Sequence, residues 1–494
     1  MTFSSLPFLF YFLPAVLILY YLFFFSRMLQ NLVLLVCSLA FYAWGEPKYI
    51  VLLLASIAVN YFLGLFIGAA KNSKHAAKFF MICGLIFNIG MLFVFKYLSF
   101  FSQNISYATG GKTGVVNIAL PIGISFFTFH AISYILDIYR GDSPAQKNPF
   151  NFALYLSFFP KLTQGPITKY KTFEPQITDR RETVRKFSSG ACFFIVGLGK
   201  KVLLANNMAI VADRMFKFID MGGMPVSNAW LGALAYTFQI LFDFSGYSDM
   251  AIGLGLMFGF KLEQNFNYPY ISKSIREFWR RWHMSLGLWF RDYLYFPLGG
   301  SRVKNNDIVI RNLAIVWIAT GVWHGANWTF LIWGIINFAC IALERMFNYE
   351  TSKIPNAVRH IYTMFVVVMG WVIFRSDSLQ SAGSYFLCMF NFVKYGFYNA
   401  YTFMFLKEFG LFFLLCAIFS TPLASTVNHF MTKGILVRKT IDPVAPYEEH
   451  ALYSEAPLTK ALSIAYPVAL MLLFAVCVAY LVKGSYNPFI YFKF

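Results

Sequence analysis

Long apolar runs dominate this chain and leave few folds open to it. A helix needs about 20 apolar residues to cross the hydrocarbon core of a bilayer. Within a bilayer every backbone polar group must be satisfied internally, which helices achieve. We therefore predict an all-α polytopic membrane protein with about eleven or twelve spanning or half-spanning helices. The clearest runs cover approximately residues 6–26, 30–45, 49–69, 79–97, 118–137, 229–244, 308–323, 328–345, 358–374, 407–424 and 461–482.

Composition supports one membrane domain over residues 1–494. Hydrophobic residues make up 58% of the chain and charged residues 13%, whereas charged residues are about a quarter of an ordinary soluble domain. The sequence shows no soluble domain, internal repeat or low-complexity linker. No basic residue precedes the run 6–26 and no small-residue cleavage site follows it. We expect this run to be an anchored helix, not a removed signal peptide.

The net charge of +19 lies in loops between the apolar runs. This pattern is typical of loop anchoring by the positive-inside rule and does not indicate a nucleic-acid surface. Loop 70–78 carries three lysines, so we predict that it is cytoplasmic and that the N-terminus lies outside. The polar stretch 427–460 is expected to form a cytoplasmic loop with one or two short helices. The tail 483–494 is then extracytoplasmic.

Two of the seven histidines are candidates for chemistry. His324 lies in the run GVWHGANW between two apolar stretches, and an ionisable group at membrane depth is costly and usually functional. Its ordinary pKa of about 6.5 suits a general base. His283 lies in the run RRWH. No His-Glu-x-x-His spacing or cysteine cluster accompanies them, so we predict no metal site. The seven cysteines are scattered along the chain, and we expect them to be reduced residues that pack within the membrane domain.

Segment 271–296 is predicted as a helix with a cationic stripe and an aromatic one. Steps of three and four residues align Arg276, Arg280, His283, Gly287 and Arg291. In one interpretation this is an interfacial helix whose arginines reach lipid phosphates. In the other, Arg276, Arg280 and Arg291 bind the phosphates of an acyl-coenzyme A.

Several motifs together resemble the membrane-bound O-acyltransferase (MBOAT) family, and they are closest to its bacterial branch of alginate and peptidoglycan O-acetyltransferases. They lie in the first 345 residues, with 120–345 as the motif-bearing catalytic core. Besides the WHGAN run, the motifs are LPIGISF (120–126), YILDIYRG (134–141), FDFSGYSDM (242–250) and FWRRWHMSL (278–286).

The resemblance implies an activity and a location. It implies a multi-pass protein of the bacterial cytoplasmic (inner) membrane, with helices ringed around a central funnel. Such a protein takes an acetyl group from a cytoplasmic donor, acetyl-CoA as substrate with no bound cofactor. It passes the group across the membrane for O-acetylation of an extracytoplasmic polysaccharide. A separate secreted or periplasmic serine esterase-like (SGNH-type) partner completes the transfer. Alginate, peptidoglycan and other exopolysaccharides remain open.

The resemblance also assigns roles within the WHGAN and RRWH runs. The near-invariant histidine of the family falls on His324, which implies a general base, and His283 would orient the acceptor or polarise the carbonyl. Trp323, Asn327 and Trp328 would flank the catalytic imidazole. Asn327 could donate to the oxyanion, and it could equally tie two helices together.

Asp243 and Asp249 bracket Phe-Ser-Gly-Tyr-Ser near membrane depth. Carboxylates there normally pair with basic side chains or face water. We expect structural ion pairs, with a direct acid-base role as the lesser alternative.

The chain ends in Phe-Ile-Tyr-Phe-Lys-Phe, which resembles the C-terminal motif of the small partner peptide in bacterial teichoic-acid D-alanylation. That resemblance implies that Tyr491 could carry an acyl group from His324 to an external acceptor. The alternative is an aromatic belt at the membrane interface, where tyrosine is common.

A different class of protein also fits some of these features. A secondary transporter could use intramembrane histidine and aspartate as a proton relay, but the internal symmetry expected of many transporters is missing from the sequence. A third possibility keeps the MBOAT fold and changes the acceptor to a lipid or a protein; the bacterial motifs argue against it.

Overall fold

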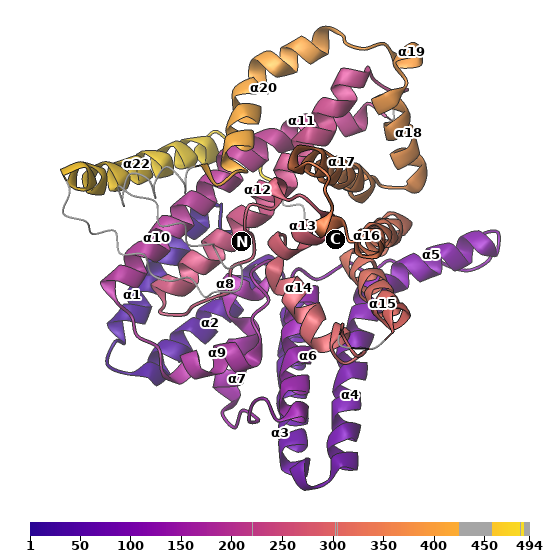
Figure 1. Ribbon diagram of the computed structural model, residues 1–494. Helices are drawn as coiled ribbons and strands as arrows, with labels where there is room; N and C mark the ends of the chain where they lie inside the picture. The colour runs from indigo at the N-terminus through magenta and orange to yellow at the C-terminus, as the bar shows by residue number, and fades with distance from the viewer. Residues whose placement is uncertain (220, 302, 304, 424–456, 485, 489–494) are drawn as a thin grey trace.

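The computed structural model describes residues 1–423, apart from 220, 302 and 304, together with residues 457–484 and 486–488 (Figure 1). Side chains are described from residue 465 onward in the last helix. The predicted polar loop over 427–460 falls almost wholly outside the described residues. No strand occurs in the described part of the chain, as the prediction of an all-α fold requires.

The N-terminal half includes a hairpin of α3 and α4 that projects from the body of the molecule (Figure 1). The elements of this half are η1 (Phe8–Phe12), α1 (Leu13–Leu22), α2 (Arg27–Gly45), α3 (Ile50–Ala69), η2 (Ala70–Asn72), α4 (Lys74–Leu92), η3 (Phe93–Tyr97), α5 (Leu98–Ala108), α6 (Ile124–Arg140), α7 (Pro149–Ser157), α8 (Phe159–Leu162), α9 (Tyr170–Thr178), α10 (Val184–Gly199), η4 (Lys200–Ala205) and α11 (Asn206–Lys217).

The C-terminal half begins with the longest helix, α12, and continues as short helices followed by long hairpins. Its elements are α12 (Val226–Met257), η5 (Pro269–Ile271), α13 (Ile275–Arg281), α14 (Met284–Phe290), η6 (Arg291–Tyr295), α15 (Asn306–His324), α16 (Trp328–Met346), η7 (Tyr349–Thr351), α17 (Asn356–Arg375), α18 (Leu379–Phe390), α19 (Phe392–Tyr395), α20 (Ala400–Phe419) and α22 (Pro457–Val482).

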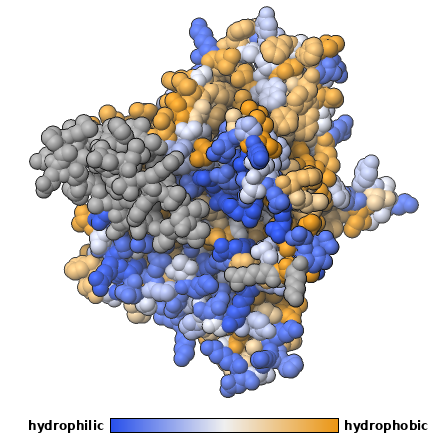
Figure 2. Space-filling view, in the orientation of Figure 1, coloured by the Kyte–Doolittle hydropathy of each residue, from blue (hydrophilic) through white to orange (hydrophobic). Residues whose placement is uncertain are grey.

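Eight helical stretches among the described residues are long and apolar enough to span a membrane. This is fewer than the predicted eleven or twelve because α6, α12, α15 and the shorter apolar stretch Phe8–Leu22 are not among them. α6 and α12 lie in the interior and carry buried polar residues. Hydrophobic side chains dominate the upper part of the face in Figure 2, whereas hydrophilic ones gather in its centre and lower part. The protein is therefore a multi-pass membrane protein with a polar interior.

One spanning stretch, Val184–Lys217, is absent from the predicted runs. Lys200 and Lys201 interrupt its apolar sequence. In the structure the two ammonium groups pair with Asp249 and Asp243 of α12, at 2.6 and 2.5 Å. Because a paired charge is tolerated inside a membrane protein, the lysines do not end the span.

Helix α12 packs closely against α10 through glycines on both helices. A Cβ atom at Gly197 would lie 2.6 Å from the carbonyl oxygen of Gly246, and one at Gly246 would lie 2.8 Å from that of Gly197. Gly190 and Gly253 form a second reciprocal contact, with each added Cβ 2.5 Å from the other residue's carbonyl oxygen. Small residues at such crossings let helix backbones approach closely. The contacts fix α12, which bears Asp243, against α10.

Filling this crossing is expected to destabilise the fold. In Gly246→Ala the new methyl group meets backbone atoms that cannot move aside. We expect the free energy of unfolding to fall by about 1–3 kcal/mol, measured as a lower melting temperature in detergent. Gly410→Ala in α20 is the matched control, because a Cβ there meets nothing within 4 Å. Equal melting temperatures for the two variants would contradict the close crossing.

A break at His283 divides segment 271–296, so the prediction of one continuous helix is wrong. α13 (Ile275–Arg281) ends before the break and α14 (Met284–Phe290) starts after it, while His283 itself has a left-handed φ of 44°. The carbonyl oxygen of Asn265 accepts a hydrogen bond of 2.9 Å from the backbone N–H that follows His283. The break turns the chain and disrupts the predicted cationic stripe.

Candidate active site

His324 is the last residue of α15, where the helix gives way to the non-helical link into α16. Gly325 is extended, with φ −179° and ψ 161°. The imidazole is buried, with 5% of the residue exposed. Three aromatic rings close around it, with ring centroids 4.8 Å away for Trp323, 5.0 Å for Trp333 and 5.1 Å for Phe374. Such an apolar enclosure excludes water from the ring, which favours a neutral imidazole able to accept a proton.

His283 and His324 both lie beside the ring of Trp323. The His283 ring centroid is 6.1 Å from that of Trp323. Its Nδ1 is 3.0 Å from Oδ1 of Asn265, and that same oxygen accepts hydrogen bonds from the backbone N–H and the hydroxyl of Ser285 at 3.2 and 3.0 Å. Because the Ser285 N–H must donate, the shared atom is an acceptor and His283 Nδ1 carries its proton.

This tautomer leaves Nε2 of His283 as the basic nitrogen. Nε2 is buried and has no hydrogen-bond partner among the described residues. A buried nitrogen without a partner costs free energy unless a ligand uses it. The geometry is thus suited to accepting a hydrogen bond from a substrate hydroxyl, the orienting role predicted for His283.

Asn327 and Trp328 start α16 instead of closing over the imidazole. Oδ1 of Asn327 caps the helix by accepting from Thr329 N–H at 3.1 Å, and its Nδ2 donates to the carbonyl oxygen of Asp377 at 2.8 Å. The ring of Trp328 is 51% exposed and contacts Phe100 of α5. The amide of Asn327 therefore ties two connections together, and Trp333 and Phe374 occupy the flanking place predicted for Trp328.

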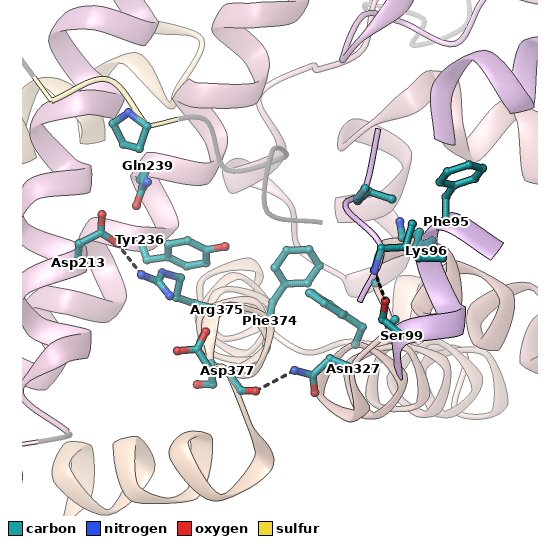
Figure 3. A pocket seen from close by; sticks show the side chains of 17 residues that line it. Phe95, Lys96, Ser99, Asp213, Tyr236, Gln239, Asn327, Phe374, Arg375 and Asp377 are labelled. Atoms are coloured by element: carbon teal, nitrogen blue, oxygen red, sulfur yellow. Dashed lines mark hydrogen bonds and ion pairs between the residues drawn. The ribbon is translucent and has the colours of Figure 1, made fainter. Parts of the chain in front are cut away.

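Two adjoining cavities lie beside His324. The larger has a volume of about 310 Å³ and is lined by the link 325–327 and by residues 374–377 (Figure 3). The smaller, of about 30 Å³, is lined by His324, Trp323 and residues 120–126 of the LPIGISF motif. Lys96 and Leu120 line both cavities. His324 lines the smaller cavity, and the larger cavity begins at the next residue, Gly325.

Polar groups lie in the wall of the larger cavity. Asp213 and Arg375 form an ion pair of 2.6 Å there (Figure 3). The hydroxyl of Tyr236 and Oε1 of Gln239 are buried without hydrogen-bond partners among the described residues. Tyr236 lies on α12 two turns before Asp243, and Gln239 lies one turn before it. The cavity thus offers hydrogen-bonding groups to a polar occupant.

Asp243 and Asp249 form ion pairs, the structural role expected for them. Asp243 and Lys201 are both 1% exposed in their side chains, with Nζ 2.5 Å from the carboxylate, whereas Lys200 and Asp249 are 29% and 20% exposed. The buried pair lies deep in the polar interior. The second pair lies nearer the surface of the α10–α12 unit.

The buried pair also contacts the C-terminal segment. Lys201 Nζ donates to the carbonyl oxygen of Pro488, and Pro488 lines the larger cavity. Asn487 bonds Ser4 and Asn206, at 3.1 and 3.2 Å, and the hydroxyl of Tyr486 donates to Asp213 at 2.8 Å. Residues 486–488 are thereby tied to the cavity wall. Tyr491, the predicted acyl carrier, lies outside the described residues.

The arginines predicted to bind a donor are divided between two places. Arg276 and Arg280 both lie by Glu350, at 3.0 and 3.8 Å, and about half of each side chain is exposed. Arg291 instead pairs with Asp292 at 2.7 Å. The three guanidinium groups therefore do not form the single predicted stripe, because the chain breaks at His283.

Around Asp292 the structure assembles basic groups that the sequence stripe did not indicate. Lys169 pairs with its carboxylate, and Arg140 donates to its backbone carbonyl oxygen at 3.0 Å. Burial raises the pKa of Asp292, but hydrogen bonds from Arg291 and Lys169 outweigh burial and hold the pKa below its ordinary value. With one carboxylate among three basic residues, this cluster retains positive charge.

Lys96 is a site residue that the sequence reasoning missed. It belongs to η3, within the apolar stretch Lys74–Ala108, and only 9% of it is exposed. The run 79–97 was predicted as a span with Lys96 near its end, where a lysine commonly reaches the interface. The rule that singled out His324, an ionisable group at membrane depth, applies equally to Lys96.

Known proteins resemble this chain over its whole length. The model of the MBOAT, membrane-bound O-acyltransferase family matches residues 143–384. A probable alginate O-acetylase of Pseudomonas aeruginosa is 40% identical over 100% of both chains. The peptidoglycan O-acetyltransferase of Helicobacter pylori is 38% identical over 72% of this chain and 73% of its own. The teichoic acid D-alanyltransferase of Streptococcus thermophilus is 30% identical over 47% of this chain and 60% of its own.

The similarity reaches beyond the motif-bearing first 345 residues, since the alignment with the Pseudomonas protein covers the entire chain. It agrees with a helical membrane fold that encloses a buried histidine between two cavities. The chain therefore belongs to the membrane-bound O-acyltransferase family and is an O-acyltransferase.

Proposed function

We propose that this protein takes an acetyl group from acetyl-CoA at the cytoplasmic face and passes it across the membrane for O-acetylation of an extracytoplasmic polysaccharide. His324 is the general base. The observation that carries this proposal is the position of His324 beside two adjoining cavities. The names of the relatives, alginate O-acetylase and peptidoglycan O-acetyltransferase, support acetyl as the group transferred.

The chemistry requires a base, a leaving group and stabilisation of an oxyanion. The unprotonated nitrogen of His324 accepts the hydroxyl proton of the acceptor as the acceptor oxygen bonds to the thioester carbonyl carbon. The tetrahedral oxyanion collapses, the carbon–sulfur bond breaks, and the thiolate takes the proton from the imidazolium. The products are an acetyl ester and free CoA thiol. Nε2 of His283 accepts a hydrogen bond from the acceptor and orients it.

The two cavities suggest how donor and acceptor reach His324 from opposite faces. The larger cavity is lined by Ser99, Ile118 and Pro488, which border or belong to segments 98–117 and 483–494. The distribution of loop charge assigns both segments to the outside. This cavity accordingly admits the acceptor. The acetyl-CoA phosphates are bound at the cytoplasmic face by Arg276 and Arg280 or by the basic cluster around Asp292.

Tyr491 is the first acceptor in this scheme. The support is that Pro488, three residues before it, lies in the wall of the acceptor cavity. The acetyl ester on the Tyr491 oxygen is then attacked by the serine hydroxyl of an SGNH-type extracytoplasmic partner, which hands the acetyl group to the polysaccharide. That partner selects the final polysaccharide acceptor, so alginate and peptidoglycan both remain compatible with this chain.

We expect acetyl-tyrosine at position 491 in protein supplied with acetyl-CoA in the absence of its partner. Mass spectrometry of the C-terminal peptide should find an added acetyl group in wild type and none in Tyr491→Phe or His324→Ala. Tyr480→Phe, in α22, is the matched control and should keep the adduct. A donor-fed wild type that releases thiol but carries no adduct would exclude the carrier role.

The transporter alternative gains no support from the family, whose members are named for acyl transfer. An experiment with oriented vesicles separates the two and tests the direction of transfer. Acetyl-labelled CoA supplied at the face that bears loop 70–78 should acetylate the protein, and the same donor at the other face should not. Proton-coupled solute uptake without acetylation would instead favour the transporter.

A further inference from the structure

Lys96 lies where the two cavities meet. Its side chain lines both, alongside His324 in the smaller cavity and the link 325–327 in the larger. Figure 3 shows it across the larger cavity from Asp213 and Arg375. Any group that passes from one cavity to the other must pass close to this ammonium.

The ammonium is held at this place by neutral oxygen atoms. Lys96 Nζ donates to the carbonyl oxygen of Trp323, the residue before His324, and lies 3.4 Å from the hydroxyl oxygen of Ser125. It also lies 5.5 Å from the centroid of the Trp323 ring. These contacts fix the amine against the backbone that carries the catalytic histidine.

Lys96 has no carboxylate partner among the described residues, unlike the buried Lys201. No carboxylate forms an ion pair with it in the described part of the chain, whereas Lys201 pairs with Asp243 and Lys169 pairs with Asp292. Placing a charge in a low-dielectric interior is costly unless an opposite charge compensates it. A lysine fixed there without a resident anion is suited to an anion that forms during the reaction.

We propose that Lys96 is a catalytic residue that stabilises the tetrahedral oxyanion formed from the thioester carbonyl. This inference rests on the proposed acetyl transfer. As the acceptor oxygen attacks, the carbonyl π electrons move onto oxygen, and the resulting negative charge is stabilised by the ammonium. The charge returns to form the carbonyl when the thiolate leaves. A fixed cation aimed at developing charge accelerates the reaction because it needs no reorganisation.

The role predicts a specific kinetic pattern. With an added hydroxyl acceptor that allows repeated turnover, Lys96→Met should lower kcat for thiol release by about 10²–10³-fold, the usual cost of losing one oxyanion donor, with little change in the KM for acetyl-CoA. Lys96→Arg, which keeps the cation, should recover part of kcat. Lys78→Met is the control, since Lys78 is an exposed lysine of α4, in the same apolar stretch Lys74–Ala108 as Lys96. Melting temperatures establish that each variant is folded.

A donor analogue separates oxyanion stabilisation from a structural role. In acetyldithio-CoA a sulfur replaces the carbonyl oxygen, so the tetrahedral anion bears its charge on sulfur and accepts weaker hydrogen bonds. Wild type should favour the oxygen donor by a ratio that falls substantially in Lys96→Met. A purely structural lysine would lower both rates and leave the ratio unchanged, which would overturn the inference.

The outcomes also separate this inference from the proposed function. Wild type that releases no thiol in a His324-dependent manner would overturn acetyl transfer and the role of Lys96 with it. Wild-type release that survives in Lys96→Met at more than half the normal kcat would overturn the role of Lys96 alone.

Discussion

His324→Ala is expected to lose acetyl transfer while the protein remains folded. A positioned general base contributes about 10²–10⁴-fold to rate, and the structure encloses this imidazole within three aromatic rings beside two cavities. The measurement is acetylation of the tail or of an added acceptor by purified protein, with intact folding checked by thermal melting. His75→Ala is the matched control, because His75 is an exposed histidine of α4.

The imidazole of His324 also fills space among three aromatic rings. Removing the imidazole leaves a space among Trp323, Trp333 and Phe374, so some fall in melting temperature is expected as well. A variant that melts like wild type and transfers within a factor of about three of the wild-type rate would contradict the base role; His283 would then be the next candidate.

The second large effect concerns stability and the buried pair of Lys201 and Asp243. Both side chains are 1% exposed. Lys201→Met leaves the buried Asp243 carboxylate without its lysine, and Asp243→Leu leaves the buried Lys201 ammonium without its aspartate. Either change should lower the free energy of unfolding by about 3–5 kcal/mol, the usual result of removing one partner of a buried ion pair. Thermal or denaturant unfolding in detergent measures it.

The double variant is the informative control. Lys201→Met combined with Asp243→Leu removes both charges together, and replacing a buried pair by apolar residues is often neutral or stabilising. We therefore expect the double variant to recover most of the lost stability. Lys200→Met, at the partly exposed pair with Asp249, should cost about 1 kcal/mol or less. Additive losses in the double variant would show that the two charges do not compensate each other.

The pair also connects stability with function. Lys201 donates to the carbonyl oxygen of Pro488, in the wall of the acceptor cavity. The double variant keeps the fold but removes this contact, so it should retain thermal stability while acetylating Tyr491 less efficiently.

The sequence predicted the helical hairpin of α15 and α16 and the place of His324 at its turn. Both follow from local information, because two apolar runs flank a short polar link that contains glycine and a capping asparagine. Of the three rings around His324, only that of its neighbour Trp323 was predicted. Trp333 of α16 and Phe374 of α17 were not identified, because sequence spacing does not show which side chains of those helices contact the turn.

The wrong and missing predictions share a physical cause. In each case a polar or charged group is stabilised by a partner that is distant in sequence. Lys200 and Lys201 concealed a spanning stretch because their partners lie on α12. The break at His283 was missed because hydrogen bonds to Asn265 impose a left-handed conformation within an otherwise helical pattern. Lys96 was passed over because its partners are a hydroxyl and a backbone carbonyl, which leave no mark in the sequence.

Thiol release from acetyl-CoA by the purified, lipid-reconstituted protein tests the central claim most directly, with wild type and His324→Ala measured side by side. The account predicts release of CoA thiol by wild type, with one equivalent for each tail acetylated, and loss of that release in His324→Ala. Equal release by the two proteins, or release by neither under conditions that keep both folded, would contradict acyl transfer at His324.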